Sequence, residues 1–589
     1  MPSIIEDTKS FNDWPNHQGF DTTYEERTPV ELKVTGSIPS WAAGTLYRSG
    51  IGPRKFDTVT GKYHVNHWFD GLAVVHRFQI TATNEENPTV RVIYNSRSTC
   101  DGLIERIRQT GERKTMTFAR KYDPCTSYFQ KVMSIFREQP ERLPNEHSMS
   151  ITLSADFPGL PTPSSLAQKD TKGGHASGIR TLINKTDSTV LQTLDPETLE
   201  PLGIATQRVL HPDLKGPMSA AHAKSDPVTG DVYNFNLEFG RIPTYRVFCV
   251  SASTGKTSIL ATITGADPAY IHSIFMTENY VILCVWNSFF VARGLKILWT
   301  RNILDAIGEY DNARPAQWYV IDRRTPENGG KGLIATYESD PFFAFHSVNA
   351  YEVMSEDGQG TDIVADVVAY NNLNCLKCFY LNNLVSTSPE AGQATSEIPY
   401  KSCLKRFRLP SIPASPTNIE TSRASSNASA PGMLSVERFR AILEFETDAI
   451  QSPELPIINP QYVTRPHRYV YGLNATGKSS FFDGIVKIDT KTKEAKYWSH
   501  RGQNAGEPIF VPRKLETRQS QNGVNGVLDE DDGVLLSVVL DGFSGKSYLL
   551  VLDAKTLDEV GRAHVAGPIG FGFHGIHVPA ANHKRALDL

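Results

Sequence analysis

One short turn pattern recurs five times along the 589 residues, and it constrains the fold more than any other feature. Each copy has an apolar residue, then Asp or Ser, two variable residues and Thr. The Asp or Ser side chain can accept hydrogen bonds from backbone N–H groups of the turn, and the Thr can begin a returning strand. Such hairpins are common between the outer strands of β-propeller blades. The copies are Leu194–Thr198, Val250–Thr254, Ile321–Thr325, Ile488–Thr492 and Leu552–Thr556.

The intervals between the copies are 56, 71, 167 and 64 residues. Three of them have similar lengths, and the long one has room for more than one unit and an insertion. Short runs of β-branched and aromatic residues, such as Thr89–Tyr94 (TVRVIY) and Ser547–Leu552 (SYLLVL), predict strands. Although Asp-x-x-Thr also occurs as a generic turn, five copies after apolar runs favour an all-β fold with a radial repeat, a β-propeller.

One segment interrupts this organisation. Ser411–Gly432 consists almost entirely of Ser, Pro, Ala, Thr and Asn, which predicts a disordered surface insertion at about 411–432. The turn pattern resumes after it, so the insertion is not expected to separate two domains. We therefore expect an N-terminal extension over residues 1–38 and a single β-propeller domain over residues 39–589.

Four of the sixteen histidines follow the repeated turn at similar distances. They lie 27, 21, 24 and 21 residues after the Asp or Ser of a copy, and they are His222, His272, His346 and His574. The first strand of a propeller blade lines the central axis, so four histidines at one height would meet there. Converging neutral imidazoles bind transition metals. The spacing thus predicts a metal site, and the alternative is four core histidines that hydrogen-bond to the backbone.

Charge and motif context argue against nucleic-acid and nucleotide binding. Lys and Arg number 60 and Asp and Glu 64, so the chain has no basic surplus for a phosphate backbone. Gly472–Ser479 matches the P-loop pattern and Gly570–Gly575 matches G-x-G-x-x-G. Neither is followed by a sequence that favours the helix these motifs require. Cys375 and Cys378 form a single C-x-x-C pair, which favours two ordinary thiols over a zinc site.

Compartment signals point to an intracellular protein. Seven cysteines are too few and uneven for a disulfide scaffold, and the first residues have no secretory pattern. The longest uncharged apolar stretch, Tyr280–Ala292, has 13 residues and is too short to cross a bilayer. We expect a cytoplasmic location.

Several motifs in one order resemble the carotenoid cleavage oxygenase family. They are His67–Gly71 (HWFDG), Asp123–Cys125 (DPC), Glu507–Pro512 (EPIFVP) and Gly572–Gly575 (GFHG). The similarity runs from about Pro39 to about Pro579, nearly the whole chain. Fungal members that cleave torulene or a related carotenoid are the most similar in character.

The resemblance implies a seven-bladed β-propeller with a helical and loop cap over an axial metal site. In this family Fe(II) is held by four histidines, which correspond to the four named above. Three carboxylates each accept a hydrogen bond from a ligand imidazole. The resemblance implies that Glu454 orients His346 and that Glu507 orients His574. For His272 the matching residue is Asp187, where the family usually has Glu.

The implied activity is that of a non-haem dioxygenase with O2 as co-substrate. It cleaves a C=C double bond of a carotenoid, such as torulene, to give apocarotenoid aldehydes. A stilbene-cleaving oxygenase of the same fold is the main alternative; it would need polar groups in the cavity, for which Lys121 and Tyr122 are candidates. A different class of protein, a metal-free propeller that only binds partners, remains open.

An apolar polyene predicts access from a membrane surface, and two segments have suitable patterns. Ser127–Phe136 places Tyr128 and Phe136 at helical spacing with basic residues beside them. Trp286–Leu304 interleaves apolar and basic side chains, with Phe289, Phe290, Leu295 and Trp299 as membrane or substrate-access residues. Such patches lie in the lipid interface. The alternative is two amphipathic elements packed on the propeller; the membrane interpretation predicts peripheral association.

Overall fold

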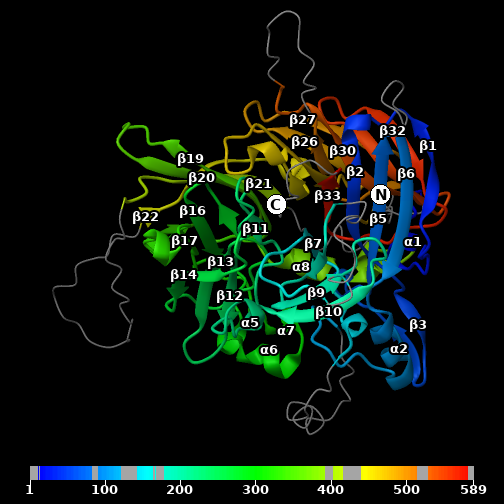
Figure 1. Ribbon diagram of the computed structural model, residues 1–589, viewed down its shortest axis with the longest axis horizontal. Helices are drawn as coiled ribbons and strands as arrows, with labels where there is room; N and C mark the ends of the chain where they lie inside the picture. The colour runs from blue at the N-terminus through cyan, green and yellow to red at the C-terminus, as the bar shows by residue number, and fades with distance from the viewer. Residues whose placement is uncertain are drawn as a thin grey trace, which may run out of the picture.

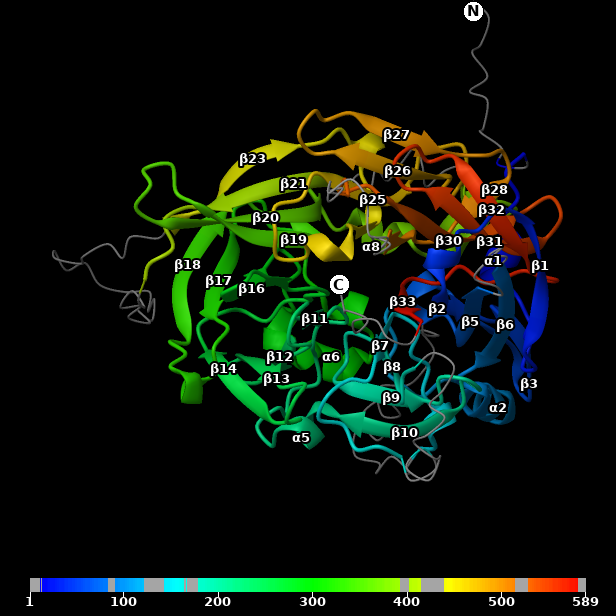
Figure 2. The ribbon, with the colours of Figure 1, turned by 45° about the horizontal axis from the view of Figure 1, so that its top comes forward.

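The computed structural model describes residue 11 and residues 13–82, 90–120, 142–163, 166, 178–391, 402–414, 439–513 and 528–580. These residues form β-sheets arranged around a common centre, and the colours pass around the ring in chain order (Figures 1 and 2). The all-β propeller predicted from the turn pattern is confirmed. Several predicted features lie outside the described residues: Lys121, Tyr122, Tyr128, Phe136, the Asp123–Cys125 motif and most of the 411–432 insertion.

Five separate sheets make up most of the ring. Their strands are β7 (Thr152–Ala155), β8 (Leu182–Lys185), β9 (Val190–Leu194) and β10 (Pro201–Thr206); β11 (Lys224–Ser225), β12 (Val232–Glu238), β13 (Thr244–Val250) and β14 (Thr257–Ile263); β15 (Phe275–Met276), β16 (Tyr280–Val285), β17 (Ala316–Asp322) and β18 (Leu333–Ser339), joined by β22 (Phe439–Arg440); β19 (Phe343–Met354), β20 (Thr361–Tyr370), β21 (Ser402–Leu409) and β23 (Ile442–Glu446); and β24 (Glu454–Ile457), β25 (Tyr469–Asn474), β26 (Gly484–Asp489) and β27 (Ala495–Trp498).

A ten-stranded sheet closes the ring by joining strands from both ends of the described chain. From the C-terminal part come β28 (Gln503–Ala505), β29 (Ile509–Pro512), β30 (Gly533–Asp541), β31 (Lys546–Asp553), β32 (Glu559–His564) and β33 (Gly575–Pro579). From the N-terminal part come β1 (Val30–Gly36), β2 (Gly44–Ile51), β5 (Ala73–Ala82) and β6 (Val90–Ser98). A separate two-stranded hairpin consists of β3 (Lys55–Thr58) and β4 (Gly61–His64).

Strand β1 explains why the described residues show five separate blades and one large sheet instead of seven separate blades. Its residues Lys33–Gly36 pair with β32, and Val30–Leu32 pair with β6. Two groups of strands therefore share β1. The segment predicted as an N-terminal extension, residues 1–38, thus contributes this strand to the propeller. Phe20 of the same segment is fully buried and packs against Phe481 and Phe571.

The helices within the described residues are short. They are α1 (His17–Phe20), η1 (Ser40–Ala42), η2 (Trp68–Asp70), α2 (Asp101–Thr110), η3 (Pro144–Glu146), α5 (Gln207–Leu210), η4 (Val291–Gly294), α6 (Leu295–Thr300), α7 (Ile303–Ala306), η5 (Pro326–Asn328), α8 (Asn374–Cys378), α9 (Leu381–Leu384), η6 (Ala449–Gln451) and η7 (Pro460–Tyr462). None of these described helices is long and apolar enough to cross a membrane.

All five predicted turns join the third and fourth strands of a sheet, counted from the centre. The Asp195 carboxylate accepts hydrogen bonds from the N–H groups of Glu197 and Thr198, at 2.8 and 3.0 Å. Asp489 and Asp553 cap their turns in the same way, and Asp322 accepts from the N–H of Arg324.

Three details of the turns and connections differ from the sequence pattern. At Ser251 the hydroxyl lies 3.1 Å from that of Ser253, and Asp231 accepts the Ala252 N–H instead. A further capped turn follows β11, where Asp226 accepts from two N–H groups at 2.7 Å. The sequence pattern requires an apolar residue before the Asp. Because Ser225 precedes Asp226, the pattern did not include this turn. In the β19–β23 sheet, residues 410–441 occupy the connection where the other sheets have the turn.

Large aromatic side chains fill the space between neighbouring sheets. Trp318 on β17 is fully buried and packs against Phe275 of its own sheet and Phe407 on β21 of the next. Its indole N–H donates to the Ser339 hydroxyl, so the polar atom is satisfied. Burial of a large apolar side chain contributes about 1.5–3 kcal/mol each. Packing between the sheets thus holds the inner strands in place around the centre.

The Asp195 cap gives a test of the turn. We expect Asp195→Ala to lower the free energy of unfolding by about 1–2 kcal/mol, because the N–H groups of Glu197 and Thr198 lose their buried acceptor. Asp195→Asn is the matched control, since its amide oxygen can still accept, and it should lose clearly less. Urea denaturation of the three proteins measures the difference. Equal stability of the Ala and Asn variants would show that the cap does not stabilise this hairpin.

Candidate metal centre

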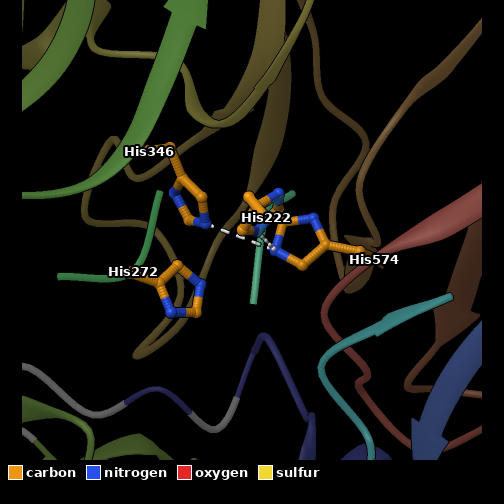
Figure 3. Close-up of side chains that lie close together, drawn as sticks. All are labelled: His222, His272, His346 and His574. Carbon is orange, nitrogen blue, oxygen red and sulfur yellow. Dashed lines mark hydrogen bonds between the residues drawn. The ribbon is translucent and has the colours of Figure 1, made fainter. Parts of the chain in front are cut away.

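Four histidines from four different sheets meet at the centre of the ring. His222 precedes β11, His272 precedes β15, His346 lies on β19 and His574 precedes β33, each beside or on the innermost strand of its sheet. One ring nitrogen of each lies within 4.8 Å of the others, and all four side chains are buried. Figure 3 shows the rings pointing toward one another. The structure thus brings together the four residues selected by their distance from the repeated turn.

Backbone contacts between sheets hold the segments that carry these histidines. The N–H of His222 donates to the carbonyl of His272 at 3.1 Å, which joins two neighbouring sheets. Ser273 then links to the next sheet, because its hydroxyl donates to the Phe345 carbonyl and accepts from the Ser347 N–H, both at 2.8 Å. Hydrogen bonds of the main chain and of the Ser273 hydroxyl therefore fix the segments of His222, His272 and His346 relative to one another.

Gly570 and Gly572 allow the segment before β33, which contains the GFHG motif, to lie directly on β2. A Cβ at Gly572 would stand 1.8 Å from the Ser49 carbonyl oxygen, and one at Gly570 would stand 1.9 Å from that of Ile51. The Ser49 hydroxyl accepts from the N–H groups of Phe573 and His574, both at 3.1 Å. This close approach, and not phosphate binding, explains the G-x-G-x-x-G spelling, and strand β33 follows it.

Each of three imidazoles contacts a buried carboxylate through Nδ1. The distances are 2.9 Å from His346 to Glu454, 2.6 Å from His574 to Glu507 and 2.7 Å from His272 to Asp187. Each carboxylate accepts a hydrogen bond from the Nδ1–H of its imidazole, so the lone pair of each ring lies on Nε2, which faces the centre. Asp187 reaches its histidine directly although it is one carbon shorter than Glu.

Three further residues that the sequence analysis missed contact these carboxylates from outside. The Tyr270 hydroxyl donates to Asp187 at 2.8 Å, and the Tyr370 hydroxyl donates to Glu454. On β2, the buried guanidinium of Arg48 donates to Glu507 at 2.7 Å. The available signal for the last one was an arginine within Gly44–Ile51, a run otherwise composed of small, apolar and hydroxyl side chains.

Burial makes three of the four imidazoles neutral at physiological pH. It lowers the pKa of His346 to about 4, and it holds the pKa values of His222 and His574 well below the usual range. Burial alone would raise the pKa of Glu454, but hydrogen bonds from His346 and Tyr370 lower it overall. For Glu507 burial dominates and raises the pKa to about 7, against the opposing charge of Arg48. Neutral imidazoles are the form that binds metals.

The arrangement of the rings fits a bound cation. Nε2 of His346 lies 3.3 Å from Nε2 of His574, and each ring donates its Nδ1 proton to a carboxylate. The two facing nitrogens therefore both present lone pairs, which repel at this distance unless a cation lies between them. Nε2 of His222 lies 3.0 Å from the same nitrogen of His574. A set of neutral imidazoles suits a transition metal.

Two hollows adjoin the four histidines. A cavity of about 590 Å³ is lined by His222, His346 and His574 together with inner-strand residues such as Ile457 and Ile576. A second, narrow gap of about 20 Å³ is lined by His272, His346 and His574 and by six aromatic side chains: Trp68, Phe69, Phe345, Phe379, Phe482 and Phe573. The histidines therefore separate a wide cavity from a closely packed aromatic wall.

The other motifs noted in the sequence have structural explanations. In Gly472–Ser479 the N–H groups of Thr476 and Lys478 both donate to Asp483, at 2.8 Å, and strand β26 follows in place of a helix. Cys375 and Cys378 are buried thiols in α8, and burial raises the pKa of Cys378 to about 12. His577 lies on β33 and is not part of the four-histidine group.

The predicted membrane-access residues are divided between surface and core. Leu295 is 51% exposed at the start of α6, and Val291 beside it is also exposed. Phe290 is only 5% exposed and packs edge-on against Phe239, so its side chain belongs to the core and does not face a membrane. Phe289 lies under the Arg314 guanidinium, 3.3 Å from the ring centroid. The backbone of Trp299 belongs to α6, and its side chain lies outside the described part.

Comparison with known families decides the affiliation of the chain. The family model described as RPE65, retinal pigment epithelial membrane protein, matches residues 19–579. The chain belongs to this family. Two fungal relatives match almost its whole length. A carotenoid dioxygenase of Neurospora crassa is 41% identical, over 97% of this chain and 92% of the relative, and a torulene dioxygenase of Fusarium fujikuroi is 40% identical, over 97% and 95%.

Solved structures agree on the fold of this RPE65 and carotenoid oxygenase family. The apocarotenoid oxygenase of Synechocystis, in a variant form, matches with a TM-score of 0.68 and 21% identity, over 97% of this chain and all of that one. Its cobalt-substituted form matches with a TM-score of 0.66. The resemblance recognised from the HWFDG, EPIFVP and GFHG motifs is thereby confirmed.

The Asp187 contact gives a test of the centre. We expect Asp187→Ala to weaken metal binding by about 10–100-fold, because His272 loses the acceptor that orients its ring. Asp187→Asn keeps an acceptor oxygen of the same length and should weaken binding less. Competition with a chelator of known affinity measures both variants. Wild-type affinity in the Ala variant would mean that this carboxylate does not orient His272.

Proposed function

We propose that the protein is a non-haem Fe(II) dioxygenase that cleaves one C=C double bond of a carotenoid, torulene or a related polyene. O2 is the co-substrate and the products are apocarotenoid aldehydes. The observation that carries the proposal is the group of four buried imidazoles, three of them oriented by carboxylates. Membership of a family whose fungal relatives are named carotenoid and torulene dioxygenases supports the substrate class.

In this proposal His222, His272, His346 and His574 hold the iron through Nε2. A ferrous ion with four neutral ligands keeps its full positive charge and supplies the open coordination positions and the electrons that O2 activation requires. The three carboxylates hold the Nδ1 protons and so fix the tautomer and orientation of the rings. Because C=C plus O2 gives two C=O groups without net proton transfer, the protein needs to bind and orient the substrate but not to supply an acid or base.

The aromatic wall is the proposed contact surface for the reacting part of the polyene. Trp68 and Phe69 come from η2, and Phe379 directly follows α8. We propose that these short helices belong to the cap that the family resemblance implies on this side of the histidines. Flat aromatic rings pack well on a conjugated hydrocarbon and exclude water. The gap of about 20 Å³ must widen to admit the polyene, through side-chain movement. The position of each double bond relative to the four histidines then determines which bond is cleaved.

We also infer that the ten-stranded sheet represents two blades fused through β1. Strands β28 to β32 would form one blade and β33, β2, β5 and β6 the other, with β1 shared between them. Counted in this way the propeller has seven blades, as the family resemblance implies.

A metal and substrate assay tests the proposal. Purified wild-type protein should contain about one iron per chain and cleave torulene with uptake of O2, whereas His346→Ala should lose both. His577→Ala, three residues from His574 and outside the group, is the control and should keep iron and activity. Incubation with resveratrol in parallel tests the stilbene alternative. Cleavage of resveratrol alone would move the substrate to that class, and a wild-type protein without iron or O2 uptake would favour the metal-free binding module.

A peripheral membrane contact at η4 and α6 is a further part of the proposal. Val291 and Leu295 are exposed apolar side chains beside Arg293 and Lys296, a combination typical of interfacial segments. Gly294 has a φ of +86°, and a Cβ there would stand 2.1 Å from the Phe239 ring. The segment is therefore held against the core, while Val291 and Leu295 remain exposed on its outer side.

Vesicle flotation tests this contact. We expect Leu295→Glu to reduce binding to vesicles of neutral and anionic phospholipids several-fold, because a buried charge in the interface is unfavourable. Ile442→Glu is the matched control. Ile442 is also 51% exposed, but it lies on β23 and not in α6. Unchanged flotation of Leu295→Glu, or equal loss in both variants, would count against a specific patch at α6.

A further inference from the structure

The three carboxylates around the histidines have different outer partners. Asp187 and Glu454 each accept a hydrogen bond from a neutral phenol, of Tyr270 and Tyr370. Glu507 instead pairs with Arg48, whose side chain is almost fully buried. Arginine keeps its charge even in such surroundings. Among the described contacts of the carboxylates, the positive charge is therefore placed at one corner only, the corner of His574.

The total charge of the group shows what the Arg48 guanidinium does. A ferrous ion carries +2, the three carboxylates carry −3 together when all are ionised, and Arg48 carries +1, so the group in this form is neutral as a whole. With ferric iron the same group carries +1. A buried group with net charge is disfavoured in a low-dielectric interior. Lys224 adds a positive field at His222 but does not change between the variants considered below.

We propose that Arg48 is a charge-balancing residue that favours the ferrous over the ferric state of the centre, acting through Glu507. This inference rests on the proposed function and deepens it, because it assigns to a residue outside the metal contacts the task of setting the reduction potential. Reduction adds one electron to ferric iron and lowers the charge of the group by one, from +1 to neutral. Arg48 is a positioning residue and does not touch metal or substrate.

The contacts of Arg48 fit this task. It donates to Oε2 of Glu507, while Oε1 of the same carboxylate accepts from Nδ1 of His574 at 2.6 Å. The N–H of Gly575 also donates to Oε2, at 2.8 Å. The guanidinium therefore lies one carboxylate away from a candidate iron ligand. Its field reaches the metal position through the buried side chains of Glu507 and His574, and charges interact more strongly in a buried environment than in water.

The test removes the two charges in a defined order. Glu507→Gln keeps an oxygen acceptor for His574 but removes one negative charge, so the ferrous group becomes +1. The double variant Glu507→Gln/Arg48→Met is neutral again, and no carboxyl group remains at this corner to take up a proton. Replacement of both members of a buried ion pair is also better tolerated than removal of one. Glu507→Gln/Arg48→Lys keeps the positive charge and controls for the change of shape.

An anaerobic redox titration of the iron-loaded proteins, followed by the electron paramagnetic resonance signal of ferric iron, gives the readout. We expect Glu507→Gln to shift the ferrous-to-ferric ratio at a fixed potential by on the order of tenfold toward ferrous iron, which corresponds to about 59 mV for a one-electron couple. The Met double variant should return close to the wild-type ratio, and the Lys double variant should stay close to Glu507→Gln.

The outcomes separate this inference from the proposed function. If wild type binds iron and cleaves torulene but the Met and Lys double variants have the same potential, the charge of Arg48 does not act on the centre and the inference is overturned. The same holds if Glu507→Gln leaves the potential at the wild-type value. If wild type binds no iron, the proposed function fails first and the inference with it.

Discussion

Three carboxylates buried at the centre of the ring set the main physical requirement of this structure. An unpaired buried carboxylate is strongly unfavourable, so each one must be satisfied by donors. Asp187, Glu454 and Glu507 each accept from an imidazole and from a second donor on the outer side. These bonds direct the remaining lone pairs of the imidazoles to one point. The hydrogen bonds that satisfy the buried carboxylates are therefore the same ones that orient the imidazoles for metal binding.

The ring topology makes such a centre possible from distant parts of the chain. His222 and His574 are 352 residues apart in sequence, yet their Nε2 atoms lie 3.0 Å apart. Each sheet contributes one inner segment, and aromatic side chains such as Trp318 fill the space between sheets. Closure depends on β1, which pairs with β32 on one side and β6 on the other. A change that loosens β1 would therefore act on the centre through the packing of the whole ring.

The repeated turn was sufficient to predict the radial fold and, by distance, the four histidines. This worked because the turn lies between the third and fourth strands, so a similar number of residues leads from it to the next inner strand. The carboxylates could be assigned only by family resemblance, because Glu454 and Glu507 follow no periodic signal. Arg48, Tyr270 and Tyr370 were missed, since contacts between side chains from different sheets leave no local pattern in the sequence.

Local pattern also could not separate buried from exposed members of the amphipathic segment at 286–304. Phe290 and Leu295 have the same apolar character, but Phe239 covers the first and not the second. The number of separate blades differed from the predicted seven for a related reason. Strand β1 pairs with both β32 and β6, and this pairing depends on where the N-terminal and C-terminal strands meet in space, which no local pattern reveals.

Asp187 shows how the backbone compensates for a shorter side chain at the centre. It lies in the loop between β8 and β9, where its carbonyl accepts the N–H of Ser219 at 2.9 Å and its carboxylate accepts that of Ala221 at 3.3 Å. These contacts bring the loop against the segment that leads to His222. The same carboxylate then reaches His272 of the neighbouring sheet at 2.7 Å. One aspartate thus connects the segments of two histidines. Because its loop already lies close to the axis, the short Asp side chain is long enough to reach His272.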